Sequence, residues 1–247
     1  MAAPLEGKVA LVTGAGRNIG RAIALALADA GAAVTVNVRA NRAEGEAVVA
    51  AIASRGGAAL LAVCDVTDRG QVDAMVAAID ARFGRLDILV NNAAIRREAA
   101  FADLAYADWR AAQAVCVDGA FHCTQAALSL LKANGEGSVV NIGGMTAYTG
   151  AAMRAHVVTA KAALGGFTRA LAHELAPFGI TVNCVSPGLV DTTRASANPA
   201  HHAEHKALLG RRGSPDEIAS AVVWLASPGA RFTTGQTIHV NGGAYLN

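Results

Sequence analysis

The sequence predicts an α/β fold, in which one doubly wound parallel sheet of about seven strands has helices on both faces. Short runs rich in Val, Ile and Leu alternate with longer segments whose apolar residues recur at helical spacing. Such alternation is typical of right-handed βαβ crossovers, and uniformly apolar strands are typical of a sheet buried on both sides. The length of 247 residues and the hydrophobic share of 53% suit a single domain over residues 1–247.

The expected strands share a branched, apolar composition and short length. They are residues 9–12, 33–38, 58–63, 86–90, 137–142, 180–185 and 236–240.

The expected helices share the 3.6-residue period and are bounded by capping residues. They run through residues 19–27, 42–54, 68–83, 108–133, 152–175 and 215–226. Asp68 is the expected N-cap of the third helix and Gly84 its stop, whereas Ser214 and Pro215 open the last helix. In residues 108–133 we expect the core-facing side chains to be Trp109, Val115, Phe121, Ala126 and Leu130.

Residues 191–210 are polar and long for an α/β connection, so we interpret them as a substrate lid. His201, His202 and His205 lie in this segment without a nearby Cys, and we expect polar lid residues there and no metal site. Arg96, Arg97 and Arg194 suggest an anionic or polar group on the substrate, although solvated arginines would look the same.

Charge and cysteine content narrow the class of function. The net charge is only +2, which gives no electrostatic case for nucleic acid or an anionic membrane as a partner. The four cysteines are scattered, as expected of reduced thiols in a cytoplasmic protein. We expect no signal peptide, because the first strand begins close to the first residue, and no apolar run that spans a bilayer. A small-molecule substrate is the expected partner.

A glycine-rich turn follows the first expected strand. Residues 13–20 read Thr-Gly-Ala-Gly-Arg-Asn-Ile-Gly and lead from a buried strand into a helix. This arrangement directs free backbone N–H groups and the positive end of a helix dipole to one spot, where a pyrophosphate fits. The G-x-G-x-x-G fingerprint is incomplete, because Ile19 stands at its third glycine. A tight turn without a ligand is the alternative interpretation.

The spacing of this turn resembles the Thr-Gly-x-x-x-Gly-x-Gly turn of the short-chain dehydrogenases/reductases, with Asn18 at the middle glycine. Asn is the best substitute for Gly where φ is positive. Further motifs of that family recur in order: Cys64-Asp65-Val66, Asn91-Asn92-Ala93-Ala94, Ser186-Pro187-Gly188 with Thr192, and residues 236–243.

The resemblance implies a nicotinamide dinucleotide as cofactor. Asp65 and Val66 would flank the adenine, Asn91 and Ala93 would lie along the adenosine ribose, and residues 187–192 would hold the nicotinamide carboxamide. The full expected set of cofactor-binding residues is Gly14, Arg17, Asn18, Ile19, Gly20, Arg39, Asp65, Val66, Asn91, Ala93, Lys161, Pro187, Gly188, Val190 and Thr192.

Charge at the end of the second strand favours NADP(H) over NAD(H). NAD enzymes usually place an acid there to accept the ribose 2′-OH, but this chain reads Asn37-Val38-Arg39. Arg39 could pair with a 2′-phosphate, and Arg17 lies in the glycine turn on the same side. The alternative is that both are solvated surface arginines.

The catalytic positions depart from the family pattern. The family uses Tyr as proton donor, Lys one helical turn later, Ser after the fifth strand and Asn in the preceding long helix. Here Lys161 fills the Lys position, but Val157, Gly144 and Cys116 stand at the positions of Tyr, Ser and Asn. Cys116 is best interpreted as a small buried apolar residue.

Two further residues are candidates for the missing chemistry. His156 adjoins the Tyr position but lies about 140° round the helix from Lys161, so an exposed or interface histidine is the alternative. Tyr148 lies between the fifth strand and the second long helix, where its hydroxyl could bond a substrate or merely form a pocket wall. The candidate catalytic residues are therefore Lys161, Tyr148 and His156.

Three functions remain open. The first is an NADP(H)-dependent oxidoreductase with a rebuilt acid–base site, acting on a small carbonyl, alcohol or imine-type substrate. The second is a cofactor-binding protein without catalysis, and the third is a non-redox lyase or isomerase using the same pocket. The resemblance also implies a homotetramer, with a dimer as the alternative.

Overall fold

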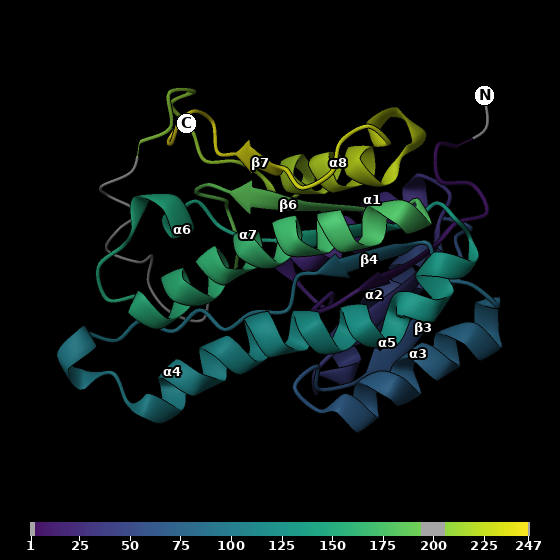
Figure 1. The fold of residues 1–247 in the computed structure, drawn as a ribbon, viewed down its shortest axis with the longest axis horizontal. Helices are drawn as coiled ribbons and strands as arrows, with labels where there is room; N and C mark the ends of the chain where they lie inside the picture. The colour runs from purple at the N-terminus through teal and green to yellow at the C-terminus, as the bar shows by residue number, and fades with distance from the viewer. Residues whose placement is uncertain (1–2, 194–205, 247) are drawn as a thin grey trace.

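The computed structural model describes residues 3–193 and 206–246. In these residues seven strands form one sheet in the order β3-β2-β1-β4-β5-β6-β7, and every neighbouring pair is parallel (Figure 1). The strands are β1 Val9–Val12, β2 Ala33–Val38, β3 Ala59–Val63, β4 Ile88–Asn91, β5 Ser138–Ile142, β6 Thr181–Pro187 and β7 Thr237–Val240. The predicted single-domain, doubly wound sheet is confirmed.

Helices cover both faces of this sheet. They are α1 Asn18–Asp29, α2 Arg42–Ala53, α3 Arg69–Phe83, α4 Tyr106–Gln113, α5 Gly119–Ala133, α6 Thr146–Thr149, α7 Ala155–Leu175 and α8 Pro215–Ala226. One apolar cluster buries α1, α2 and α8 against the sheet, and a second buries α3, α5 and α7 against the other face. In Figure 1, α5 and α7 lie in front of the sheet.

The capping residues act as the sequence predicts. The Asp68 carboxylate accepts a hydrogen bond from the Gln71 N–H, and Gly84 ends α3 with a φ of +69°. Ser214 and Glu217 form a reciprocal capping box at the start of α8. Local chemistry therefore sets these two helix starts without help from distant contacts.

The expected helix 108–133 begins two residues earlier and contains a π-helical turn at Ala114–Asp118. The residues that it buries are Ala112, Cys116, Gly119, Ala120, Cys123, Thr124, Ala127 and Leu131. The expectation that Phe121 faces the core is wrong, since this side chain is exposed. Small Ala and Cys side chains let the helix pack closely on the sheet, and the larger aromatic ring points away.

The continuous helical segment Tyr106–Ala133 is long and apolar enough, by length and composition alone, to cross a membrane. The expectation that no apolar run has this property is therefore wrong. Its residues Cys123, Ala127 and Leu131 belong to the core cluster that covers one face of the sheet. Core helices pass the same test, so the segment is weak evidence for a membrane span.

The connection from β6 to α8 is described only in part. Residues 194–205 lie outside the described residues, and so do Arg194, His201, His202 and His205. Val190 forms a bridge with Gly213, and the Asp191 carboxylate lies 2.6 Å from Nε of Arg212. These contacts tie the end of β6 to the start of α8, and the substrate lid stays a prediction.

Candidate functional site

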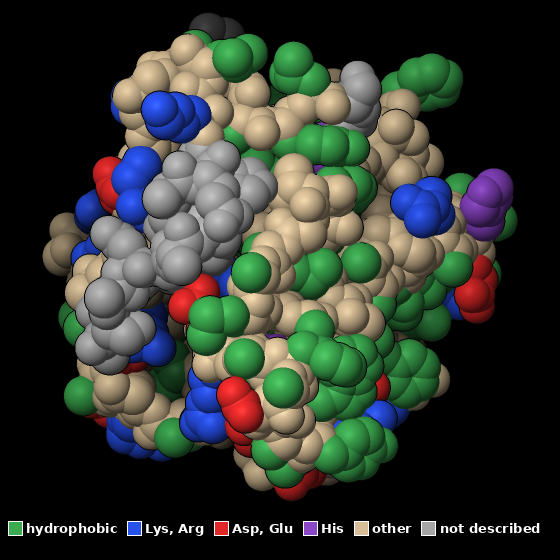
Figure 2. All heavy atoms as spheres, turned by 90° about the vertical axis from the view of Figure 1, so that its left-hand side faces the viewer, with side chains coloured by type: hydrophobic (Ala, Val, Ile, Leu, Met, Phe, Trp, Pro, Cys, Tyr) green, Lys and Arg blue, Asp and Glu red, His purple; other side chains and the backbone are tan. Residues whose placement is uncertain are grey.

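A cleft of about 730 Å³ opens at the carboxyl edge of the sheet, where ligands bind in open α/β folds. The arrows of β6 and β7 point to this edge in Figure 1. Figure 2 looks onto it, and there Lys and Arg side chains gather mostly on the left of the view and hydrophobic side chains on the right. The predicted site residues that line the cleft are Gly14, Arg17, Asn18, Ile19, Gly20, Arg39, Asp65, Val66, Ala93 and Thr192.

Close packing explains the glycines of the turn. A Cβ on Gly20 would lie 2.2 Å from the carbonyl oxygen of Gly14, so no other residue fits there. Gly14 has a φ of +63°, and the Asn18 φ of +51° bears out its expected role as a substitute for glycine. The turn therefore brings its main chain close to the neighbouring walls, and Arg17, Asn18 and Ile19 of the turn also line the cleft.

The start of α1 is built to meet an anion. Its N-cap residue, Arg17, makes no side-chain capping bond, and the first turn contains no acid. Side chains of Asn41, Asp68 and Ser214 cap α2, α3 and α8, whereas α4, α5, α6 and α7 also begin without a side-chain cap. The uncapped N–H groups and the helix dipole of α1 thus remain available to a phosphate group in the cleft.

Asn37, at the end of β2, holds the adjacent walls together. Its side-chain oxygen accepts the Gly14 N–H at 3.2 Å, and its amide donates to the carbonyl oxygen of Cys64 at 3.0 Å. The buried amide therefore fixes the glycine turn against the ends of β2 and β3. The sequence predicts that this segment matters because it lacks an acid and contains Arg39, and it gives no sign of the role of Asn37.

A carboxylate that the sequence reasoning missed lines the same end of the cleft. Glu44, in the first turn of α2, lies with Arg17 and Arg39 among the lining residues. Its Oε2 would be 3.2 Å from a Cβ on Gly16, so it is close to the glycine turn. Glu44 could have been predicted from the sequence, because the helix that follows β2 begins at this edge of the sheet and Glu44 is in its first turn.

The motif after β4 contributes a different residue from the one expected. The Asn91 side chain faces the core, donating to the Asn141 Oδ1 at 2.9 Å and to the Thr124 hydroxyl at 3.2 Å, and it does not line the cleft. Its neighbour Asn92 lines the cleft and donates to the Thr13 carbonyl at 2.8 Å. Strand alternation, applied to this pair, would have predicted the difference.

Asp65 and Val66 reach the cleft at the end of β3. The Asp65 carboxylate accepts hydrogen bonds from the N–H and the hydroxyl of Thr67, so it stabilises its own turn. Val66 is buried and presents an apolar wall.

The far end of the cleft is formed after β6. The Thr192 hydroxyl is buried and has no hydrogen-bond partner among the described residues, although the residue lines the cleft. An orphaned hydroxyl at this place is suited to a ligand. Pro187 and Gly188 support the loop through main-chain bonds to Met145 and Val240, and Val190 is buried beneath it. These three residues do not line the cleft.

Lys161 is a buried cation on α7. Its side chain is 8% exposed, and its ammonium donates to the carbonyl oxygen of Ile142 at the end of β5. Burial lowers the pKa of Lys161 below its ordinary value of 10.5, while Cys116 opposes the change and Arg96 adds to it. The amine therefore gives up its proton more readily than a solvated lysine.

None of the three residues assigned to the family's Tyr, Ser and Asn positions has a hydroxyl. Val157 lies one helical turn before Lys161 and is buried, and a Cβ on Gly144 would lie 4.0 Å from the Lys161 Cγ, in ordinary contact. Cys116 is buried in the π-helical turn, as the sequence predicts. Val157, Gly144 and Cys116 therefore all lie in the neighbourhood of Lys161.

His156 is 1% exposed, so it is not the exposed histidine that the sequence left open. Neither ring nitrogen has a hydrogen-bond partner among the described residues, and the Gln113 amide donates to its main-chain oxygen at 3.1 Å. The buried stripe of α7 is wide enough to include His156 and Lys161, which a single helical-wheel angle does not reveal. His156 does not line the cleft.

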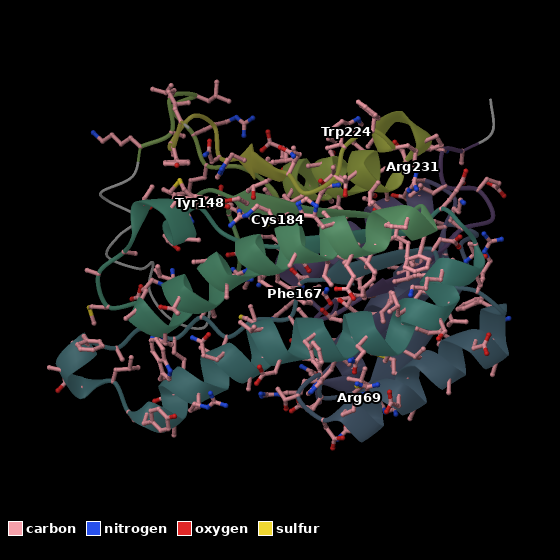
Figure 3. All side chains as sticks on the ribbon, viewed as in Figure 1. Arg69, Tyr148, Phe167, Cys184, Trp224 and Arg231 are labelled. Carbon is pink, nitrogen blue, oxygen red and sulfur yellow. The ribbon has the colours of Figure 1, made fainter. Side chains whose placement is uncertain are left out.

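Tyr148 lies on α6, against β7 and the C-terminal residues (Figure 3). Its hydroxyl hydrogen-bonds the Thr237 Oγ1 at 3.0 Å, and its ring packs on His239 and Tyr245. Tyr148 therefore contacts β7 and the C-terminal residues and does not line the cleft.

The fold and this cleft together define a dinucleotide-binding α/β protein. A family model described as enoyl-(acyl carrier protein) reductase matches residues 14–245. The 3-oxoacyl-[acyl-carrier-protein] reductase of Synechocystis sp. is 38% identical over 243 residues, which cover 98% of each chain. The (2S)-[(R)-hydroxy(phenyl)methyl]succinyl-CoA dehydrogenase subunit BbsD of Thauera aromatica is 39% identical over 246 residues, again covering 98% of each chain.

A solved structure is similarly close. The crystal structure of a short chain dehydrogenase from Burkholderia cenocepacia J2315 in complex with NADP has a TM-score of 0.91 and 38% identity, covering 98% of this chain and 99% of that one. The chain belongs to the short-chain dehydrogenase/reductase family of oxidoreductases.

Proposed function

We propose that this protein is an NADP(H)-dependent oxidoreductase of a small carbonyl, alcohol or imine-type substrate that works without the family's Tyr and Ser. One observation carries the proposal: Val157 and Gly144, which have no hydroxyl, lie near the buried Lys161, while the glycine turn and Thr192 line a cleft that suits a dinucleotide. The hydride site would therefore be kept while the usual proton donor is replaced.

The residues of the cleft fit the cofactor. The uncapped start of α1 suits a pyrophosphate, and the unpartnered Thr192 hydroxyl suits the carboxamide end. Arg17 and Arg39 suit a 2′-phosphate, although Glu44 and Asp65 contribute two carboxylates to the same cleft. A solved relative with 38% identity holds NADP, which supports the same choice here. When bound, the cofactor supplies a hydride to the substrate carbon.

The remaining residues limit which substrates can react. A ketone that accepts a hydride becomes an alkoxide and needs a proton, which neither Val157 nor Gly144 can donate. Lys161, whose pKa is lowered by burial, is the group best placed to hold or release one. An iminium carbon accepts a hydride to give a neutral amine with no proton added. The site therefore favours an iminium or an activated ketone.

The replacement of Tyr, Ser and Asn together also favours a second candidate, a cofactor-binding protein that has lost catalysis. It differs from the first in one measurable way: NADPH would bind tightly and never be consumed. Turnover without a change in nicotinamide absorbance would instead favour a non-redox reaction, with His156 or Tyr148 as the proton carrier.

The test restores the missing hydroxyls. Gly144→Ser with Val157→Tyr should increase NADPH oxidation by a 3-oxoacyl thioester at least about tenfold over the wild type, because a general acid becomes available. Gly144→Ser with Val157→Phe is the matched control, since it has nearly the same volume without the phenolic hydroxyl. The proposal would be wrong if the wild type reduced the ketone as fast as the Tyr variant.

A further inference from the structure

Two reciprocal hydrogen bonds join opposite walls of the cofactor cleft. The Asn18 amide donates from Nδ2 to the carbonyl oxygen of Thr193 at 3.1 Å, and the Thr193 N–H donates to the Asn18 Oδ1 at 2.9 Å. Asn18 lies at the start of α1, Thr193 follows β6, and both residues line the cleft. We refer to this pair of bonds as the Asn18–Thr193 clasp.

Asn18 meets two requirements that few residues combine. Its φ of +51° lies in the left-handed region, which favours Gly and tolerates Asn or Asp. A carboxamide presents one acceptor and one donor in a single plane, so it can pair with the N–H and C=O of one residue. Gly would allow the backbone conformation and make neither bond, whereas Asp would lack the donor.

Each clasp residue adjoins a group that suits the expected ligand. Asn18 follows Arg17 at the uncapped start of α1, and Thr193 follows Thr192, whose hydroxyl has no partner among the described residues. Both clasp bonds are exposed to solvent, so they can break and re-form without unfolding the sheet beneath them. A ligand that extends along the cleft would be enclosed when they form.

We propose that Asn18 is a positioning residue whose clasp with Thr193 retains a bound dinucleotide and slows its release. The proposal rests on the NADP(H) binding proposed above. It assigns to Asn18 a role that the glycine of the family turn cannot have, because the role needs a side chain.

The test measures release of NADPH by stopped-flow fluorescence and needs no turnover. Asn18→Gly removes both bonds and keeps the positive φ, so NADPH should dissociate about tenfold faster than from the wild type. Ser220→Ala is the control, because this hydroxyl bonds the Asp216 carbonyl within α8 and the residue does not line the cleft, so its dissociation rate should stay within about twofold of the wild type. The melting temperature of the cofactor-free protein should be similar in all three.

Three results would overturn the proposal. A dissociation rate from Asn18→Gly within about twofold of the wild type would show that the clasp does not retain the ligand. A lower melting temperature of that variant with unchanged release would show a merely structural role. Failure of NADPH to bind the wild type would overturn the proposed function as well, and the missing fluorescence signal distinguishes that outcome from the other two.

Discussion

At the residue scale, Lys161 is a cation buried on α7, and Asn18 adopts a positive φ in the glycine turn. The positive φ at Asn18 follows from the turn pattern alone. Its partner, Thr193, is 175 residues away and could not be inferred, because that contact depends on how β6 leaves the sheet. The burial of His156 was missed for a similar reason, since it depends on how widely the neighbouring helices cover α7.

Lys161 should make stability depend on pH. Burial lowers its pKa in the folded protein below the ordinary 10.5, so between those two values unfolding takes up a proton. Stability contributed by this residue should therefore rise with pH across that interval. Urea unfolding of the wild type and of Lys161→Met should show a difference that moves in favour of the wild type from neutral pH towards pH 10. A difference that stays constant over this range would contradict the assignment of a lowered pKa.

At the element scale, the strands and most helices follow from composition and period. The expected ends of β1 and β2 agree with the structure, because branched apolar runs are bounded there by small or polar residues. The π-helical turn at Ala114–Asp118 and the short helix α6 carry no such signal, and both pack against α7. In this segment Val115, Ala126 and Leu130 pack on the core as expected, but Phe121 does not.

The capping box of α8 should contribute measurably to stability. The Ser214 hydroxyl accepts the Glu217 N–H, and the Glu217 carboxylate accepts the Ser214 N–H at 2.8 Å. Ser214→Ala should lower the free energy of unfolding by about 1 kcal/mol in urea titrations. Ser220→Ala is the control, because its hydroxyl bonds only the Asp216 carbonyl within the same helix, and it should change stability by less than about 0.5 kcal/mol. Equal losses in the two variants would contradict a capping role.

At the scale of the whole molecule, the sheet order decides which motifs meet. The order β3-β2-β1-β4-β5-β6-β7 brings the turn after β1 beside the loops after β2 and β4, so most of the predicted cofactor residues share one cleft. The candidate catalytic residues were harder to predict, because Tyr148 and His156 pack against other parts of the chain and do not line the cleft. The homotetramer stays a prediction; Trp224 and Phe232 expose large apolar side chains beside α8, as such an interface would require.

The central claim is that the protein transfers hydride without a Tyr at position 157. A single-turnover experiment tests it most directly: the protein is saturated with NADPH, mixed with a cyclic iminium, and followed by nicotinamide absorbance and by mass analysis of the amine. The account predicts loss of NADPH matched by an equal amount of amine, and a much slower reaction with the corresponding unactivated ketone. Tightly bound NADPH that is never oxidised by the iminium or by activated ketones would contradict the account and leave a cofactor-binding protein without catalysis.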